Sequence, residues 1–166
     1  MVQRIQLCGR LLPVAVILSS ALAAPTAHAD NSSLNRAVIS DVYTIQHQAG
    51  CTNDVNSNNA LTLAAEWHAD DMLNNRNIND DMGSDGSTPQ DRANAAGFRG
   101  KVAETVATNP ALSVSNLELI KQWYHNPDDM AIMRDCANTA MGVWSENSLD
   151  RTVVVAMYGQ PAPRNR

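Results

Sequence analysis

The chain has 166 residues, which is enough for one globular domain and too few for two of ordinary size. Its 12 Lys and Arg residues against 17 Asp and Glu residues give a net charge of -5. This balance lacks the basic surface that nucleic-acid binding requires, so we expect no nucleic-acid partner. Residues 30–166 hold 10 of the basic and all 17 of the acidic side chains, because only Arg4 and Arg10 precede Asp30.

The first 29 residues have the pattern of a secretory signal peptide. Two arginines precede an apolar run over residues 11–24, and Ala27-His28-Ala29 supplies the small residues that a signal peptidase reads. The run is shorter than the about 20 apolar residues that a membrane-spanning helix needs. We therefore predict a signal peptide over residues 1–29, cleavage near Ala29, and a secreted, extracellular protein that does not span the membrane.

Removal of this segment leaves two cysteines, Cys51 and Cys136, in a chain bound for an oxidising compartment. Disulfides persist there, and exposed unpaired thiols are a liability. We expect the two cysteines to pair, which would constrain the unfolded chain by about 4–5 kcal/mol. Two free thiols are the alternative.

Two amphipathic helices are expected at the start of the mature chain. Apolar residues recur at helical spacing from Leu34 to Ala49, and Gly50 follows where a helix commonly ends. A second apolar face covers residues 61–72. It includes His68, which at such a position is expected to be a hydrogen-bonded core residue rather than a ligand.

Two further helices should begin at capping boxes. Thr88 and Asp91 have the capping-box spacing at the start of a short helix. Ser115 and Glu118 repeat it at the start of a longer one, which Pro127 should stop.

A β-hairpin is expected near the end of the chain. Residues 141–145 and 152–158 are rich in β-branched and aromatic side chains, and a polar segment joins them. Val153-Val154-Val155 indicates a strand covered on both faces. Helices interleaved with a small antiparallel sheet indicate an α+β layered domain over residues 30–160, with residues 161–166 as a C-terminal tail.

The common catalytic and metal signatures are missing. No zinc-binding His-Glu-x-x-His helix, phosphate loop or nucleophile elbow occurs in the sequence. Residues 80–86 resemble the start of a calcium loop, but Arg92 stands where that loop needs its bidentate glutamate.

Several short motifs are more informative in their order than singly. They are Leu63-Ala64-Ala65-Glu66-Trp67-His68-Ala69-Asp70-Asp71-Met72, Gly83-Ser84-Asp85-Gly86-Ser87 with Arg92, Ala96-Gly97-Phe98, Val102-Ala103-Glu104-Thr105-Val106-Ala107, Trp123-Tyr124-His125-Asn126-Pro127 and Met141-Gly142-Val143. Together they resemble the bacterial secreted branch of the CAP superfamily, which unites cysteine-rich secretory proteins, antigen 5 and pathogenesis-related proteins. The segment Val102–Ala107 is similar to the family's Gly-Glu-Asn-hydrophobic-Ala motif, and the segment Trp123–Pro127 is similar to its Trp-x-x-Ser-Pro-Gly-His motif. The resemblance covers residues 34–159.

This resemblance implies a three-layer α-β-α sandwich around a small antiparallel sheet, with a cleft in which two histidines and one or more glutamates often hold zinc. It also implies that the three tryptophans are at least partly buried. Counted from the motifs, the two cleft histidines fall on Asp81 and Asp129, and only Glu104 matches the family. His125, one helical turn before Asp129, either restores a nitrogen ligand or is a cation at a helix end.

These departures set our expectations for cofactors. Zinc favours imidazole and thiolate, whereas carboxylates suit harder ions. We therefore predict no cofactor and no zinc site. Asp81, Glu104 and Asp129 should form an acidic cluster that binds calcium or magnesium weakly or not at all.

Two functions are consistent with the sequence. The first is a non-catalytic binding module for a lipid or other small apolar ligand, a cell-envelope component or a protein. The alternative is a hydrolase in which Glu104, the one candidate catalytic residue, divides acid and base roles with Asp81 or Asp129. A purely structural role for these carboxylates is the third interpretation.

Overall fold

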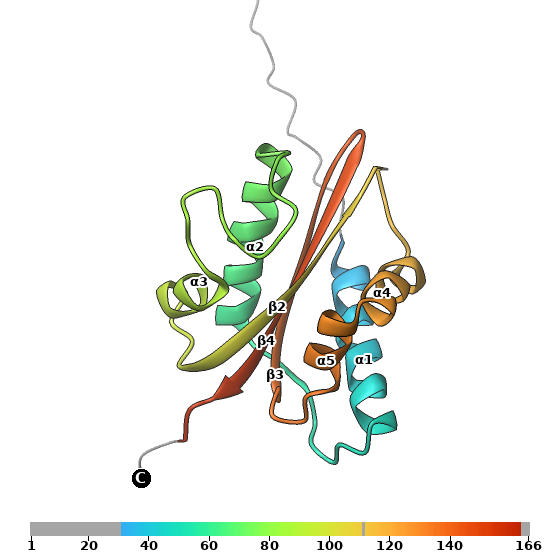
Figure 1. Cartoon of the computed structure of the whole chain (residues 1–166), viewed down its shortest axis with the longest axis vertical. Coiled ribbons are helices and arrows are strands. Elements are labelled where there is room, and N and C mark those ends of the chain that lie inside the picture. Colours follow the sequence, from blue (N-terminus) through green and yellow to red (C-terminus); the bar gives the residue numbers. More distant parts are fainter. Residues whose placement is uncertain (1–30, 111, 164–166) are drawn as a thin grey trace, which may run out of the picture.

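The computed structural model describes residues 31–110 and 112–163 (Figure 1). The predicted signal peptide lies outside these residues. Within them, no helix combines the length and apolar composition that a membrane span requires.

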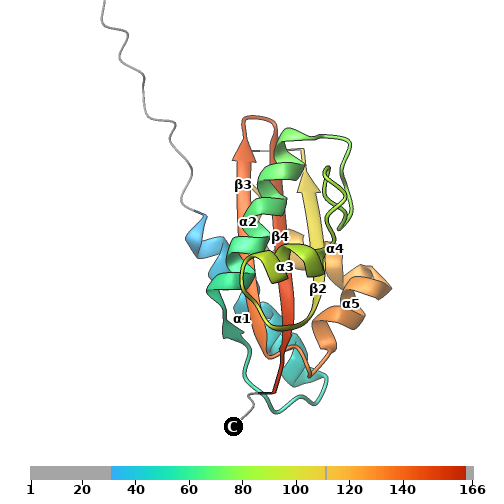
Figure 2. The same ribbon diagram turned by 90° about the vertical axis from the view of Figure 1, so that its left-hand side faces the viewer.

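The described chain folds into three layers, with a sheet between two groups of helices (Figure 1). One face of the sheet is covered by α1 (Ser32–Gln48), α4 (Asn116–His125) and α5 (Pro127–Arg134). The other face is covered by α2 (Asn59–Asn74) and α3 (Pro89–Ala95), which lie nearest the viewer in Figure 2. The expected α-β-α sandwich is confirmed.

The sheet has the strand order β1-β3-β4-β2, with bounds β1 (Asn56–Ser57), β2 (Gly100–Asn109), β3 (Ala140–Ser148) and β4 (Arg151–Pro161). The three long strands are antiparallel, as expected, and β3 and β4 form the predicted hairpin. The short β1 differs, because it pairs with β3 in parallel. Strand β4 includes Pro161, the first residue of the expected tail.

The central strand β4 divides the core into two halves. Val153, Val155 and Met157 pack with the α2 and α3 side, and Val154, Ala156 and Tyr158 pack with the side of α1, α4 and α5. None of these six side chains is more than 1% exposed. The three consecutive valines are therefore covered on both faces, as the sequence predicts.

Close packing of α2 on the sheet depends on a glycine in the Met141-Gly142-Val143 motif. A Cβ atom at Gly142 would collide with the backbone of Leu61 and Thr62 at the start of α2. Only a residue without a side chain lets the helix approach β3 so closely.

Both predicted capping boxes are present, and the chain also forms an additional helix. The hydroxyls of Thr88 and Ser115 accept from the amides of Asp91 and Glu118, respectively. Pro127 follows the end of α4 at His125, as expected, but it also begins α5. Proline suits the first position of a helix, because the amide hydrogen that it lacks would have no partner there.

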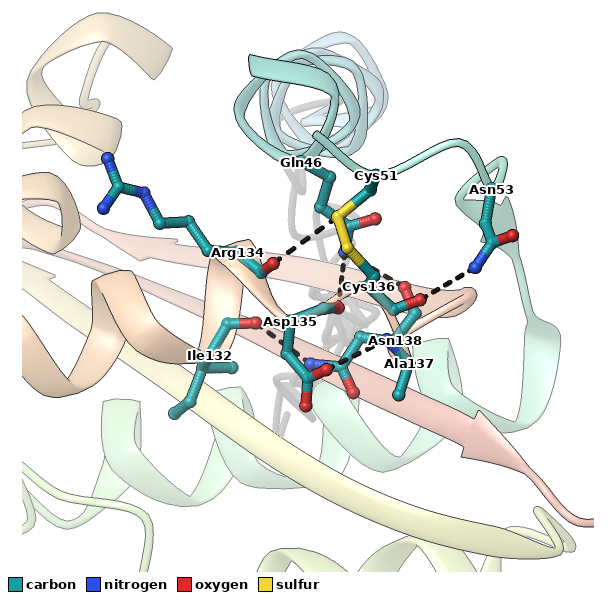
Figure 3. The surroundings of a disulfide bond; sticks show 9 residues. All are labelled: Gln46, Cys51, Asn53, Ile132, Arg134, Asp135, Cys136, Ala137 and Asn138. Carbon is teal, nitrogen blue, oxygen red and sulfur yellow. Dashed lines mark hydrogen bonds between the residues drawn. A yellow bond between two sulfur atoms is a disulfide. The ribbon is translucent and has the colours of Figure 1, made fainter. Parts of the chain in front are cut away.

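The predicted disulfide between Cys51 and Cys136 is confirmed, and it joins the segment after α1 to the segment after α5 (Figure 3). Hydrogen bonds reinforce this connection. The buried Gln46 amide donates to the carbonyls of Asp135 at 3.2 Å and Asn138 at 3.1 Å, and Asn53 donates to the carbonyl of Cys136 at 3.1 Å. The end of α1 is therefore held against the end of α5.

The three tryptophans differ in exposure. Trp123 is 1% exposed, and its indole Nε1 donates to the Val106 carbonyl at 2.9 Å. Trp144 is half-buried, as expected. Trp67, on the outer side of α2, is 41% exposed and is the least covered of the three.

Candidate functional site

Glu104, the residue that matches the family cleft, lies in the middle of β2 and faces α2 and α3. Its side chain is 0% exposed. Oε1 lies 2.7 Å from His68 Nδ1 and 3.0 Å from Arg92 Nη2, and Oε2 lies 3.1 Å from the same Nη2. A buried carboxylate needs such partners, because desolvating an unpaired charge is costly. Both oxygens of Glu104 are thus engaged inside the protein.

Arg92, on α3, connects Glu104 to the preceding loop. Nη2 donates to the backbone carbonyl of Asp81 at 2.7 Å, and Nη1 donates to the carbonyl of Ser87 at 2.8 Å and its hydroxyl at 3.2 Å. The guanidinium therefore neutralises Glu104 and also holds both ends of the loop over residues 81–87.

His68 contacts both members of the ion pair through one ring nitrogen. Its Nδ1 lies 2.7 Å from Glu104 Oε1 and 3.1 Å from Arg92 Nη2. The other ring nitrogen, Nε2, is buried without a hydrogen-bond partner among the described residues. The expectation that His68 is a buried, hydrogen-bonded residue is confirmed, because its side chain is 0% exposed.

The four residues predicted to line the cleft lie in different surroundings. Asp81 meets Arg92 through its carbonyl, while the residue itself is exposed. Asp129 belongs to α5, on the other side of the sheet from Glu104. The pKa of Asp129 is raised mainly by burial and to a lesser extent by the nearby charge of Asp128. His125 is exposed at the end of α4.

His125 lines a surface hollow of about 350 Å³ together with residues of α4 and the last residue of β2. Its ring lies edge-on to Tyr124, with centroids 5.8 Å apart. Among the described residues, no group of three or more His, Cys, Asp and Glu side chains could hold a metal ion. The expected acidic cluster of Asp81, Glu104 and Asp129 is therefore not assembled as a metal site, because its members come from both sides of the sheet.

A second hollow lies beside the Glu104 network. We call it the α2–α3 hollow; it measures about 340 Å³ and is lined by Trp67, His68, Asp71, Ser84, Asp85, Ser87, Arg92 and Ala95. The sequence analysis did not assign it. Its signals were present in the one-turn spacing of Trp67 and Asp71 on α2 and in the Gly83–Ser87 motif, but only the fold brings these segments together.

Two carboxylates in the α2–α3 hollow are held in fixed positions by local hydrogen bonds. Asp71 accepts from the Ser84 amide at 2.7 Å, the Ser84 hydroxyl at 2.6 Å and the Asn75 side chain at 2.6 Å. Burial acts to raise the pKa of Asp71, but these hydrogen bonds together lower it. Hydrogen bonding by Ser87 lowers the pKa of Asp85. Both groups are therefore negatively charged at neutral pH.

With the fold and this geometry established, comparison with known proteins identifies the family. The sequence profile described as "CAP: Cysteine-rich secretory protein family" matches residues 47–158. The match covers more than half of the chain, which therefore belongs to this family. None of the curated proteins compared with the chain matched it.

Solved structures agree on the fold. An outer surface protein of Borrelia burgdorferi superposes with a TM-score of 0.71 at 15% identity, over 82% of this chain and 98% of that one. An extracellular protein containing an SCP domain from Bacillus anthracis gives 0.65 at 13% identity, over 78% of this chain and 41% of that one. Venom allergen-like protein 4 of Schistosoma mansoni gives 0.54 at 14% identity, over 80% and 92% of the two chains. At these identities the likeness concerns the fold alone.

Proposed function

We propose that this CAP domain is a secreted, non-catalytic binding module that recognises a component of the cell envelope. Lipids and other small apolar ligands or proteins are the other ligand classes that the sequence analysis kept open. The observation that carries the proposal is the condition of Glu104, the one cleft residue that this chain shares with the family pattern.

A general base must reach the proton that it removes. Glu104 has a side chain that is 0% exposed, and Arg92 and His68 occupy both of its oxygens. Through these contacts Glu104 joins β2 to α2 and α3. This arrangement favours a structural role for Glu104 and weakens the hydrolase alternative, in which Glu104 acts with Asp81 or Asp129. Asp129 also lies on α5, which covers the face of the sheet opposite to Glu104 (Figure 1), so the two carboxylates are not placed to act together.

Two related structures are titled as an outer surface protein and an extracellular protein, which supports secretion of this chain. The disulfide also suits an oxidising compartment. Cleavage near Ala29 would leave a mature protein that begins at Asp30. N-terminal sequencing of the protein recovered from culture medium tests this, and a retained leader in that protein would contradict it.

A turnover assay separates a binder from an enzyme. The protein would be incubated with ester, glycoside and peptide substrates beside Glu104→Gln and the control Asp54→Asn, which removes a charge from the exposed loop after α1. We expect no turnover by any of the three. Turnover that disappears only in a folded Glu104→Gln protein would overturn the proposal. Native mass spectrometry of protein from the secretion medium should reveal the bound component.

We also propose that the domain has no zinc site and binds calcium or magnesium weakly or not at all. Imidazole, which zinc favours, is missing at Asp81 and Asp129. Calorimetry on metal-free protein at neutral pH checks this. Stoichiometric zinc binding with a Kd on the order of micromolar or tighter, abolished by Glu104→Ala, would contradict it.

A further inference from the structure

The accessible groups of the α2–α3 hollow are mostly hydrogen-bond acceptors. Asp71 and Asp85 provide carboxylates, and these groups cannot donate. The strongest donor nearby, the Arg92 guanidinium, directs both of its terminal nitrogens to Glu104, Asp81 and Ser87. The two carboxylates therefore favour a ligand that brings hydrogen-bond donors, whereas the Arg92 Nε is a buried donor without a partner among the described residues.

The charge of the hollow has the same implication. The positive charge of Arg92 is balanced by the negative charge of Glu104, with which it is in contact at 3.0 Å. Asp71 and Asp85 remain, and they make the hollow negative. Anionic ligands are repelled by such a site, whereas cations are attracted.

A fully buried polar side chain in the wall provides independent support. His68 lines the hollow, and its Nδ1 is turned to Glu104. The opposite ring nitrogen, Nε2, is buried with no hydrogen-bond partner among the described residues. Buried polar atoms without partners are rare in native proteins, and a polar group placed deep in the hollow would give this one a partner.

The indole of Trp67 supplies an apolar wall. It is 41% exposed, whereas Trp123 is 1% exposed, so α2 presents an aromatic face to solvent beside two carboxylates. An aromatic face next to negative charge is the combination that recognises organic ammonium groups.

We propose that the α2–α3 hollow binds the alkylammonium group of an envelope component, with Trp67 against its apolar part and Asp71 and Asp85 around its positive end. The proposal rests on the proposed binding function and names the chemistry that this function would recognise. About 340 Å³ suits a small head group rather than a long chain.

The test uses n-butylammonium chloride as the probe and n-butanol as its neutral counterpart at equal ionic strength. The indole N–H signals of the three tryptophans are followed by NMR in ¹⁵N-labelled protein, and the Trp67 signal is assigned by its loss in Trp67→Phe. We expect n-butylammonium to shift the Trp67 signal saturably, with a Kd on the order of millimolar, and to leave Trp123 unchanged. Butanol should cause no saturable shift.

Two variants locate the binding. Asp85→Asn removes an exposed charge from the hollow and should weaken binding about threefold. Asp54→Asn removes the same charge from the loop between α1 and β1 and should not weaken it. An equal response to butanol, no response to n-butylammonium, or equal weakening by both variants would each overturn the proposal.

Failure here is distinguishable from failure of the proposed function. If an envelope component co-purifies with the protein but n-butylammonium does not bind, the proposed binding function stands and the proposed site is wrong. If n-butylammonium binds saturably but the protein proves to be an enzyme, the site stands and the proposed binding function is wrong.

Discussion

At the scale of residues, two Arg–carboxylate pairs differ in burial and should differ in their contribution to stability. Arg92 and Glu104 have side chains 6% and 0% exposed, whereas Arg76 and Asp150 are 56% and 65% exposed. We expect Arg92→Met to lower the free energy of unfolding by about 3–5 kcal/mol, because it leaves Glu104 buried beside a single remaining partner. Arg76→Met should have little effect. Urea denaturation measures both.

The double variant Arg92→Met/Glu104→Leu provides the control for this prediction. It leaves neither charge unpaired, so its loss should be smaller than the sum of the two single losses by about 1–3 kcal/mol. Strict additivity would mean that the two residues stabilise the fold independently, and would contradict the role assigned to the pair.

The exposed pair should instead be visible in a titration. Hydrogen bonds from the Arg76 guanidinium and then the Ser148 hydroxyl lower the pKa of Asp150 from 3.8 to about 2. A lowered pKa stabilises the folded state above pH 3.8, and this contribution is lost as the pH falls from 3.8 towards 2. In Arg76→Met we expect the pKa of Asp150 to rise part of the way back, as measured by NMR. An unchanged pKa would show that Arg76 is not its main partner.

The sequence identified single residues of the site better than their partners. Glu104 follows from the family motif, and buried His68 follows from helical periodicity. Their contact could not be predicted, because 36 residues separate them and only the packing of α2 against β2 brings them together. Arg92 was part of a matched motif, but its hydrogen bonds to Asp81 and Ser87 depend on the path of a loop that has no periodic pattern.

At the scale of elements, Asn126 serves two helices. It follows α4, and its side-chain oxygen accepts from the amides of Asp128 at 3.0 Å and Asp129 at 3.4 Å at the start of α5. Asn126→Ala should lower the free energy of unfolding by about 1 kcal/mol, as the loss of a helix cap does. Asn126→Ser keeps an acceptor and should stay near the wild type. Urea denaturation of both checks this, and equal losses would exclude a capping role.

This same junction explains why α5 was not predicted. Pro127 follows the end of α4, as expected, but the next helix begins at that residue. A proline after a possible cap is compatible with the end of one helix and with the start of another, and α5 has only eight residues in which to show a helical period.

Strand β2 was not predicted for another reason. Lys101 and Glu104 interrupt its apolar pattern, because it lies at the sheet edge and carries a buried ion pair.

At the scale of the whole molecule, the elements with strong local signals determine the architecture. Four helices and the hairpin were predictable from caps and periodicity, and the hairpin supplies the central strand β4, on which both halves of the core are built. The side of the sheet on which each helix packs has no local signal. The resemblance implied a sandwich but placed no helix on a particular face, and this placement separates Glu104 from Asp129.

The disulfide acts on most of the chain, because Cys51 and Cys136 are 85 positions apart and the segment between them contains β1, α2, α3, β2, α4 and α5. Joining its ends restricts the unfolded chain far more than the folded one, in which Gln46 already holds the end of α1 against the carbonyls of Asp135 and Asn138. We therefore expect the double variant Cys51→Ala/Cys136→Ala to keep the fold and to lose about 4–5 kcal/mol of the free energy of unfolding.

Urea denaturation with and without dithiothreitol distinguishes the cross-link from the side chains. Reductant should destabilise the wild type by nearly the amount that the double variant loses, and it should leave the double variant unchanged. A fold of this size has a stability of about 5–15 kcal/mol, so the loss would be a large part of the total. A double variant as stable as the oxidised wild type would mean that the contacts between α1 and the segment after α5, rather than the covalent bond, hold the two ends of this segment together.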